Sequence, residues 1–262
     1  MKRRYDLVLR SLGSEYMSEP DSKDLAKWIS GQRGSRCDLI SYNIEKSLLA
    51  QKKADIPCTG GVYYSARVSE SIGGIKSGCL CSEPYPVLDD ISLDAQRVRK
   101  LRKGCYMALP APSSLGIQDY YFNDHADLIS ALCEVYRKMM REQRDRGIKG
   151  HIVVSDRFSE VELEELSDPK SFFFSPSGGS KAISSILEYQ QDIAVFPEKL
   201  DILFEIMPEY EINSVTVVDP GESDYERVLS EFDPDSVLSG GYCRGCGMDY
   251  WENLKEKSYV VA

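Results

Sequence analysis

Two cysteines three positions apart are the strongest chemical signal in the chain. They lie in the segment Cys243-Arg244-Gly245-Cys246. This segment follows a short apolar run at Val237-Leu238 and precedes a stretch with helical periodicity, so it falls where a strand leads into a helix. Two thiols at this spacing can hold one metal ion, close a redox-active disulfide, or lie near each other as independent structural thiols. The sequence leaves these three interpretations open.

Three further cysteines are candidates for the same site. Cys58 follows a short predicted strand, and Cys79 and Cys81 lie in a stretch rich in Gly and Pro. If all of them reach Cys243 and Cys246, the site has four or five thiolate donors, which suit zinc or, as an alternative, an iron–sulfur cluster. The remaining cysteines fall in predicted helices or strands and are expected to be buried, reduced thiols: Cys37, Cys105 and Cys133.

Polar side chains follow several of the predicted strands. Asp156 and Asp219 come directly after apolar runs, where a carboxylate can hold a substrate ammonium or act as a general base. Both can equally cap the next helix or its turn. The polar residues expected to bind substrate around them are Ser155, Arg157, Ser175 and Tyr242. Arg157 suits a carboxylate or phosphate, or a salt bridge at the rim.

The elements that must position these residues follow a repeating pattern. From His151 onward, a short apolar strand, a turn and an amphipathic helix recur about every 20 residues. Strands are expected near positions 7, 56, 107, 153, 173, 194, 217 and 238. This pattern fits an open doubly wound sheet or a (β/α)₈ barrel, and the lack of a GxGxxG fingerprint favours the barrel. Ligands bind barrels at the carboxyl ends of the strands, so the candidate residues above are expected to share one rim.

The barrel is expected to form a single domain over residues 1–262, with a hairpin or lid insertion at 62–92. The first strand is predicted to end at Gly13-Ser14, and Ser22 to cap a helix over 21–29. A long helix is predicted after Asn123 or Asp124. Gly147 is expected to end this helix. The helix is amphipathic, because its apolar residues fall at spacings of three and four: Leu128, Leu132, Val135, Tyr136 and Met139.

The bulk composition narrows the class of partner. The chain has 262 residues and a net charge of −10, which disfavours nucleic acid as a partner because phosphate binding needs a basic surface. No apolar run approaches the roughly 20 residues of a membrane span, and the first residues do not resemble an export signal. We therefore expect a cytoplasmic protein that binds a small-molecule substrate, with its oligomeric state open.

Four segments resemble cobalamin-independent methionine synthases and the related uroporphyrinogen decarboxylase-like barrels. The run from Leu109 to Asp156, LPAPSSLGIQDYYFNDHADLISALCEVYRKMMREQRDRGIKGHIVVSD, resembles their third and fourth βα units. QKKADIPCTGG resembles the second unit, VTVVDP the seventh strand and DSVLSGGYCRG the eighth. The resemblance implies a (β/α)₈ barrel that transfers a methyl or alkyl group to a thiol held as a thiolate on zinc. The implied donor is a corrinoid or folate.

The chain departs from the family at the metal ligands. The family has His-x-Cys after the fifth strand, a carboxylate after the sixth and Cys after the eighth. Here the fifth strand reads Phe173-Phe174-Ser175 and the sixth ends in Phe196-Pro197, so only Cys243 matches. One hypothesis is therefore a methyl- or alkyltransferase with a rebuilt, cysteine-rich metal site. The alternative is a degenerate barrel that binds a ligand or protein partner without turnover.

Overall fold

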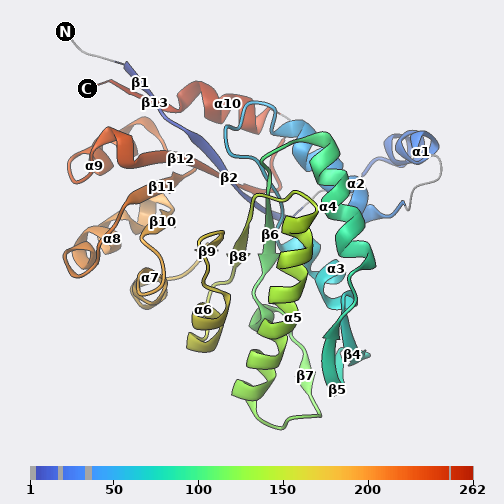
Figure 1. The fold of residues 1–262 in the computed structure, drawn as a ribbon. Helices are drawn as coiled ribbons and strands as arrows, with labels where there is room; N and C mark the ends of the chain where they lie inside the picture. The colour runs from blue at the N-terminus through green and yellow to red at the C-terminus, as the bar shows by residue number, and fades with distance from the viewer. Residues whose placement is uncertain (1–3, 17–19, 33–36, 248, 262) are drawn as a thin grey trace.

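The computed structural model describes residues 4–16, 20–32, 37–247 and 249–261. Its centre consists of two four-stranded parallel sheets, in the order β10-β11-β12-β2 and β3-β6-β8-β9 (Figure 1). The eight strands therefore follow one another in chain order, and the last lies beside the first, as in a (β/α)₈ barrel. They are β2 (Leu9–Tyr16), β3 (Cys58–Gly60), β6 (Tyr106–Pro110), β8 (Gly150–Val154), β9 (Ser171–Phe174), β10 (Asp192–Val195), β11 (Ser214–Val218) and β12 (Val237–Arg244).

The backbone ladder is interrupted at two places, and the amide of a glutamine bonds backbone groups at each of them. Between β2 and β3 the described residues form only two isolated bridges. There Gln51 bonds both backbone groups of Cys58, accepting from its N–H (3.0 Å) and donating to its C=O (2.7 Å). Between β9 and β10 no ladder forms among the described residues. There Gln190 accepts from the N–H of Phe173 (2.7 Å) and donates to the C=O groups of Phe173 (3.0 Å) and Asp192 (2.7 Å). Strand order is thus that of a barrel, while the hydrogen-bonded ring is incomplete.

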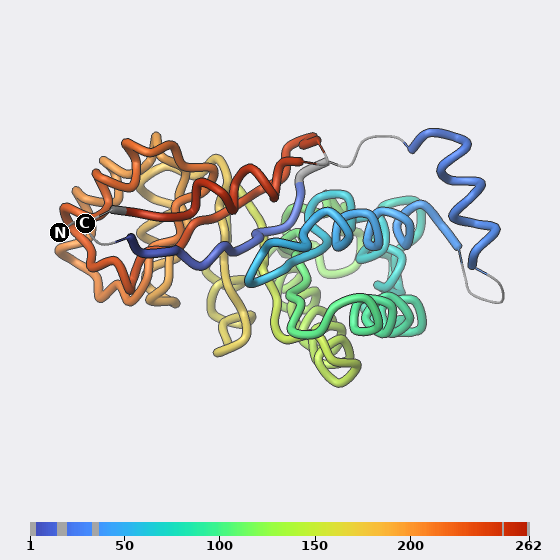
Figure 2. The backbone as a smooth tube through the Cα atoms, turned by 90° about the horizontal axis from the view of Figure 1, so that it is seen from above, coloured from blue at the N-terminus to red at the C-terminus, as the bar shows by residue number. Residues whose placement is uncertain are grey.

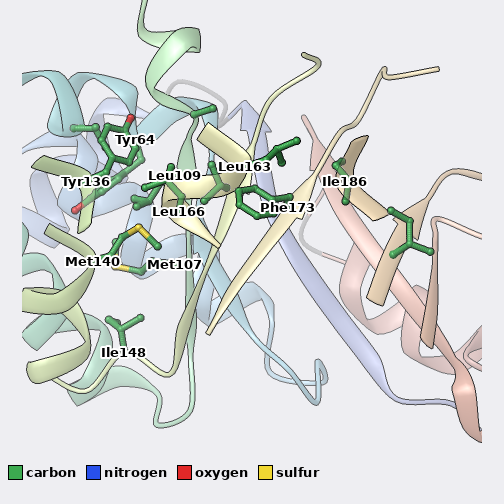
Figure 3. Close-up of a cluster of buried hydrophobic side chains, with 14 of the residues drawn as sticks. Tyr64, Met107, Leu109, Tyr136, Met140, Ile148, Leu163, Leu166, Phe173 and Ile186 are labelled. Atoms are coloured by element: carbon green, nitrogen blue, oxygen red, sulfur yellow. The ribbon is translucent and has the colours of Figure 1, made fainter. Parts of the chain in front are cut away.

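Helices pack outside the strands. Their bounds are α1 (Ser22–Gly31), α2 (Leu39–Ala50), α3 (Ser65–Glu70), α4 (Asp89–Leu101), α5 (His125–Asp145), α6 (Glu160–Leu166), α7 (Ser180–Leu187), α8 (Leu200–Ile206), α9 (Glu222–Leu229) and α10 (Tyr250–Lys257). Figure 3 shows the core between helices and strands, where Met107 and Leu109 of β6 face Tyr136 and Met140 of α5. A separate cluster fills the inner face of the strands and includes Phe172, Phe174, Phe196 and Tyr242. Alternate residues of each strand supply the two cores, because successive side chains point to opposite faces.

The long helix α5 follows its sequence pattern closely. Asp124 is the N-cap, and its carboxylate accepts hydrogen bonds from the N–H groups of Ala126 (2.8 Å) and Asp127 (3.1 Å). Gly147 follows the helix with a φ of +109°, a conformation that favours glycine. The expected apolar residues of α5 are all buried. Local capping and periodicity were sufficient to predict this element.

The amino-terminal third differs from the predictions. The first expected strand is two strands: β1 (Arg4–Asp6) pairs antiparallel with β13 (Tyr259–Val261), and β2 runs past Gly13-Ser14 to Tyr16. Figure 2 shows the first and the last described strand side by side, as this pairing requires. Asp21, rather than Ser22, caps α1, because its carboxylate accepts from the N–H of Lys23 (2.8 Å).

The segment 62–92 contains α3 and an antiparallel hairpin of β4 (Ile72–Lys76) and β5 (Cys79–Pro86), and β7 (Gln118–Asp119) adds a third strand. A hairpin is therefore present in this segment, and its role as a lid stays a prediction. The helix α4, which begins in this segment, was not predicted. No helix of the described residues is both long and apolar enough to cross a membrane.

Candidate functional site at the carboxyl ends of the strands

The ends of β11 and β12 bring several candidate residues together. Val218 of β11 is in register with Gly240 of β12, and the N–H of Asp219 donates to the C=O of Gly240 (2.9 Å). This pairing places Asp219 beside the last residues of β12, which include Tyr242 and Cys243. The expectation that residues after the seventh and eighth strands share one rim is met for these positions.

Cys243 and Cys246 are joined by a disulfide in the structure, with their Cα atoms 5.3 Å apart. The N–H of Cys246 also donates to Cys243 Sγ (3.3 Å). Cys243 is buried at 6% exposure, whereas Cys246 is half-buried. The more accessible sulfur of the pair is therefore that of Cys246. Of the three interpretations of this spacing, the disulfide is the state that the structure contains.

Asp219 and Tyr250 form an acid–phenol pair next to the disulfide. The Tyr250 hydroxyl, on the first residue of α10, donates to Asp219 Oδ1. Burial raises the pKa of the Asp219 carboxyl, and the bonds from Tyr250 and the Tyr242 backbone together with the charge of Arg244 partly offset this. The Asp219 residue stays exposed as a whole, which limits the size of this shift. Burial and the Asp219 charge raise the pKa of Tyr250, so its hydroxyl remains a donor.

Aromatic side chains fill the inner face of the strands below this rim. The ring of Tyr242 meets that of Phe174 edge to face at 5.2 Å between centroids, and Phe174 lies 6.2 Å from Phe196. The guanidinium of Arg244 lies over the Phe196 ring at 4.6 Å. The candidate residues at this end thus lie above a packed interior, with the Arg244 cation beside them.

The candidates after β8 and β9 form a second group. Asp156 Oδ1 accepts from the N–H of Ser177 (2.9 Å), and the Ser175 hydroxyl donates to the Asp156 C=O (3.3 Å). Ser155 is buried, and its hydroxyl donates to the C=O of Arg157 (2.7 Å). These contacts stabilise the turns themselves. Asp156 and Arg157 also line a cavity of about 810 Å³, together with the turn at 177–180 and Lys181.

The other three candidate cysteines lie elsewhere. Cys58 is fully buried in the inner-face cluster, and burial raises the pKa of its thiol well above the usual value. Cys79 and Cys81 are on the β4–β5 hairpin, which lies beside α5 in Figure 1, and Cys79 Sγ contacts Gln118 Oε1 (3.6 Å). Within the described part of the chain, no three His, Cys, Asp or Glu side chains are grouped so that they could hold a metal ion.

The residues present do not fit the zinc site that the resemblance implies. Where the family has His-x-Cys and then a carboxylate, this chain has Phe173-Phe174-Ser175 and Phe196-Pro197. The sulfur of the matching Cys243 is bonded to Cys246. A zinc ion needs four donors, or three and a water. We therefore derive no reaction step through a metal, and the zinc and iron–sulfur hypotheses remain predictions.

Tyr250 is a residue of this rim that was not predicted from the sequence. It had a usable signal, since it opens the helix that follows the cysteine pair and so lies beside the strand ends. For Arg244, which lies between the two cysteines, no separate role was predicted. Its place over Phe196 depends on β10, which is remote in sequence.

The strand order and rim define a class of α/β proteins with parallel strands arranged as in (β/α)₈ barrels. A solved structure with the same arrangement is a B12-independent methionine synthase from Shewanella sp. W3-18-1 in complex with selenomethionine. It is 13% identical, with 96% of this chain and 94% of that chain covered and a TM-score of 0.51. This likeness shows the fold alone. A candidate member of the dihydrodipicolinate synthase family from Coccidioides immitis is 9% identical, covers 97% of this chain and 64% of that one, and has a TM-score of 0.37. Neither protein-family models nor curated proteins match the chain.

Proposed function

We propose that the protein is a methionine-synthase-like barrel that performs thiol–disulfide exchange with a small-molecule substrate at the ends of β11 and β12. The observation that carries this proposal is the Cys243–Cys246 disulfide on the rim where barrels bind ligands. One sulfur of the pair is buried and the other accessible, which suits an attacking and a resolving thiol.

The reaction starts from the reduced pair and a substrate disulfide. The Cys246 thiolate attacks one substrate sulfur, the substrate S–S bond breaks, and the first substrate thiolate leaves with the electron pair. The Cys243 thiolate then attacks Cys246 Sγ, and the second substrate thiolate leaves. The enzyme dithiol is oxidised, the substrate is reduced to two thiols that take up the protons, and a small thiol reductant restores the dithiol. In this proposal the Asp219 carboxyl, which has a raised pKa and lies on the neighbouring strand end, exchanges a proton with the pair.

The test measures reduction of hydroxyethyl disulfide by dithiothreitol with catalytic amounts of protein. We expect turnover with the wild type and its loss, by at least about 100-fold, in Cys243→Ser and Cys246→Ser. Cys81→Ser is the matched control, because Cys81 is exposed and lies on the hairpin. The proposal fails if the wild type does not exceed the uncatalysed rate, or if Cys246→Ser matches it.

A second candidate function is methyl or alkyl transfer to a thiol, and the fold likeness to a methionine synthase favours it. A substrate thiolate would attack the methyl carbon, forming a C–S bond while the donor leaves with the electron pair. The test incubates reduced protein with a corrinoid or folate methyl donor and a small thiol, and detects the thioether by mass spectrometry. Thioether formation that survives in Cys246→Ser favours this function over exchange. If neither reaction occurs but ligands bind, the degenerate barrel is the better description.

A further inference from the structure

Arg10 is a buried arginine with no carboxylate partner among the described residues, and it lies at the end of the strands opposite the cysteine pair. It is the second residue of β2, and its side chain lies on the inner face, 8% exposed. Its Nε has no hydrogen-bond partner, and among the residues that the structure describes no carboxylate forms an ion pair with it. Buried charges in proteins are otherwise paired, because losing water without replacing it is costly.

The surroundings of Arg10 are aromatic. The guanidinium carbon lies 3.8 Å from the ring centroid of Phe172 and 5.9 Å from that of Tyr106. Stacking on a ring stabilises the cation but satisfies none of its five N–H donors, which lie in the plane of the guanidinium. The charge of Asp192 raises the pKa of Arg10, against the larger effect of burial. The Asp192 carboxylate bonds to another group, because its Oδ1 accepts from the Ser214 hydroxyl (2.6 Å).

A second unpaired polar group lies on the same inner face. Thr216 of β11 is buried, and its Oγ1 has no hydrogen-bond partner. Arg10 and Thr216 flank Gly240 of β12: Arg10 is in register with it, and a Cβ at position 240 would lie 2.6 Å from Thr216 Cγ2. A Cβ at position 240 would meet the Thr216 methyl group, so glycine lets the Thr216 side chain lie over β12 on this face. Lys149, with its Nζ 5.6 Å from the Tyr106 ring, adds a cation at the same end.

We propose that this end of the strand array binds a small oxyanion, a phosphate or a carboxylate, through the Arg10 guanidinium and the Thr216 hydroxyl. A planar fork of N–H donors matches two oxygens of such an ion, and a hydroxyl supplies a further donor. The site lies at the amino-terminal ends of the strands, opposite the cysteine rim. Its role is to stabilise the fold when the anion is present, so it is independent of the proposed exchange reaction.

The test follows the melting temperature of the full chain as inorganic phosphate replaces chloride at constant ionic strength, with acetate as the carboxylate arm. For the wild type we expect a rise that grows with the logarithm of the phosphate concentration above Kd and reaches about 5 °C at 100 times Kd. Arg10→Met should abolish the rise and melt in chloride no lower than the wild type, since it removes an unpaired buried charge. Arg141→Met, on an arginine at the surface of α5, should keep the full response.

Arg10→Lys covers the case in which Arg10→Met does not fold. It keeps the charge with fewer donors, so the phosphate concentration that gives the same rise should be about tenfold higher. The proposal is overturned by a wild type that phosphate does not stabilise, by an unchanged response in Arg10→Met or Arg10→Lys, or by a response that Arg157→Met removes. It is also overturned if Arg10→Met melts well below the wild type in chloride, because Arg10 would then have a partner within the protein.

Discussion

His151 is a histidine that folding keeps neutral. It is fully buried at the start of β8, and its Nε2 lies 2.8 Å from Gln143 Oε1. Burial, reinforced by the charge of Arg144, lowers its pKa from 6.5 to about 3. A ring that is neutral in the folded protein and charged in the unfolded chain has a consequence for stability.

His151 predicts a loss of stability in acid. The unfolded chain binds a proton below pH 6.5 while the folded protein does not, so the free energy of unfolding falls as pH drops from 6.5 towards 3. Between pH 7 and pH 5 this group should cost the wild type about 2 kcal/mol. His151→Gln can keep a bond to Gln143 and does not titrate, so it should lack that part of the loss. Urea unfolding at both pH values measures it, and equal losses in the two proteins would contradict the assignment.

At the scale of elements, a buried arginine side chain connects three helices. Arg67 of α3, 2% exposed, bonds Asp94 of α4 (2.8 Å) and Asp38, the N-cap of α2 (2.6 Å). Asp94 also accepts from the Tyr64 hydroxyl (3.0 Å). Three helices thus meet at one buried guanidinium. The sequence contains these charged residues but does not show that they meet. They lie on helices separated by loops, and the path of those loops depends on tertiary packing.

Asp94→Ala should be strongly destabilising. It leaves the buried Arg67 with one of its two closest carboxylates missing, and breaking a buried pair costs about 3–5 kcal/mol. Glu70→Ala is the matched control, because Glu70 contacts the same arginine at 3.4 Å with a side chain that is 60% exposed. That variant should change stability by less than about 1 kcal/mol. Denaturant unfolding compares them, and similar losses for both would show that Asp94 has no special role.

Gln190 gives a second prediction at this scale. Gln190→Ala leaves the N–H and C=O of the buried Phe173 without their partner, at a cost of about 2 kcal/mol. Gln191→Ala, whose amide bonds Glu211 and Asn213 at the surface, should be nearly neutral. Thermal unfolding of both variants tests this. If Gln190→Ala is as stable as Gln191→Ala, water replaces the glutamine amide at no cost in stability. The Gln190 hydrogen bonds then do not stabilise the fold.

At the scale of the molecule, the gap between β9 and β10 divides the strand array. β8 and β11 have strand partners on both sides, while β9 and β10 each have one. Backbone groups without a ladder partner open more readily. We expect the amides of β9 and β10 to exchange with solvent faster than those of β8 and β11, as hydrogen–deuterium exchange with peptide-level readout can measure. Equal protection of all four strands would mean that a closed barrel forms in solution.

The sequence by itself determined what depends on neighbours along the chain. The caps and apolar stripe of α5 follow from spacing and turn chemistry over a few residues, as do the strands β6, β8, β9, β10, β11 and β12 and the closeness of Cys243 to Cys246. The tertiary structure alone decided that Cys58, Cys79 and Cys81 lie away from that pair and that Tyr250 meets Asp219. It also decided that no carboxylate of the described residues pairs with Arg10. These outcomes depend on how strands that are distant in sequence pack together. Contacts between such distant residues leave no pattern among neighbouring residues, so they cannot be predicted from the sequence alone.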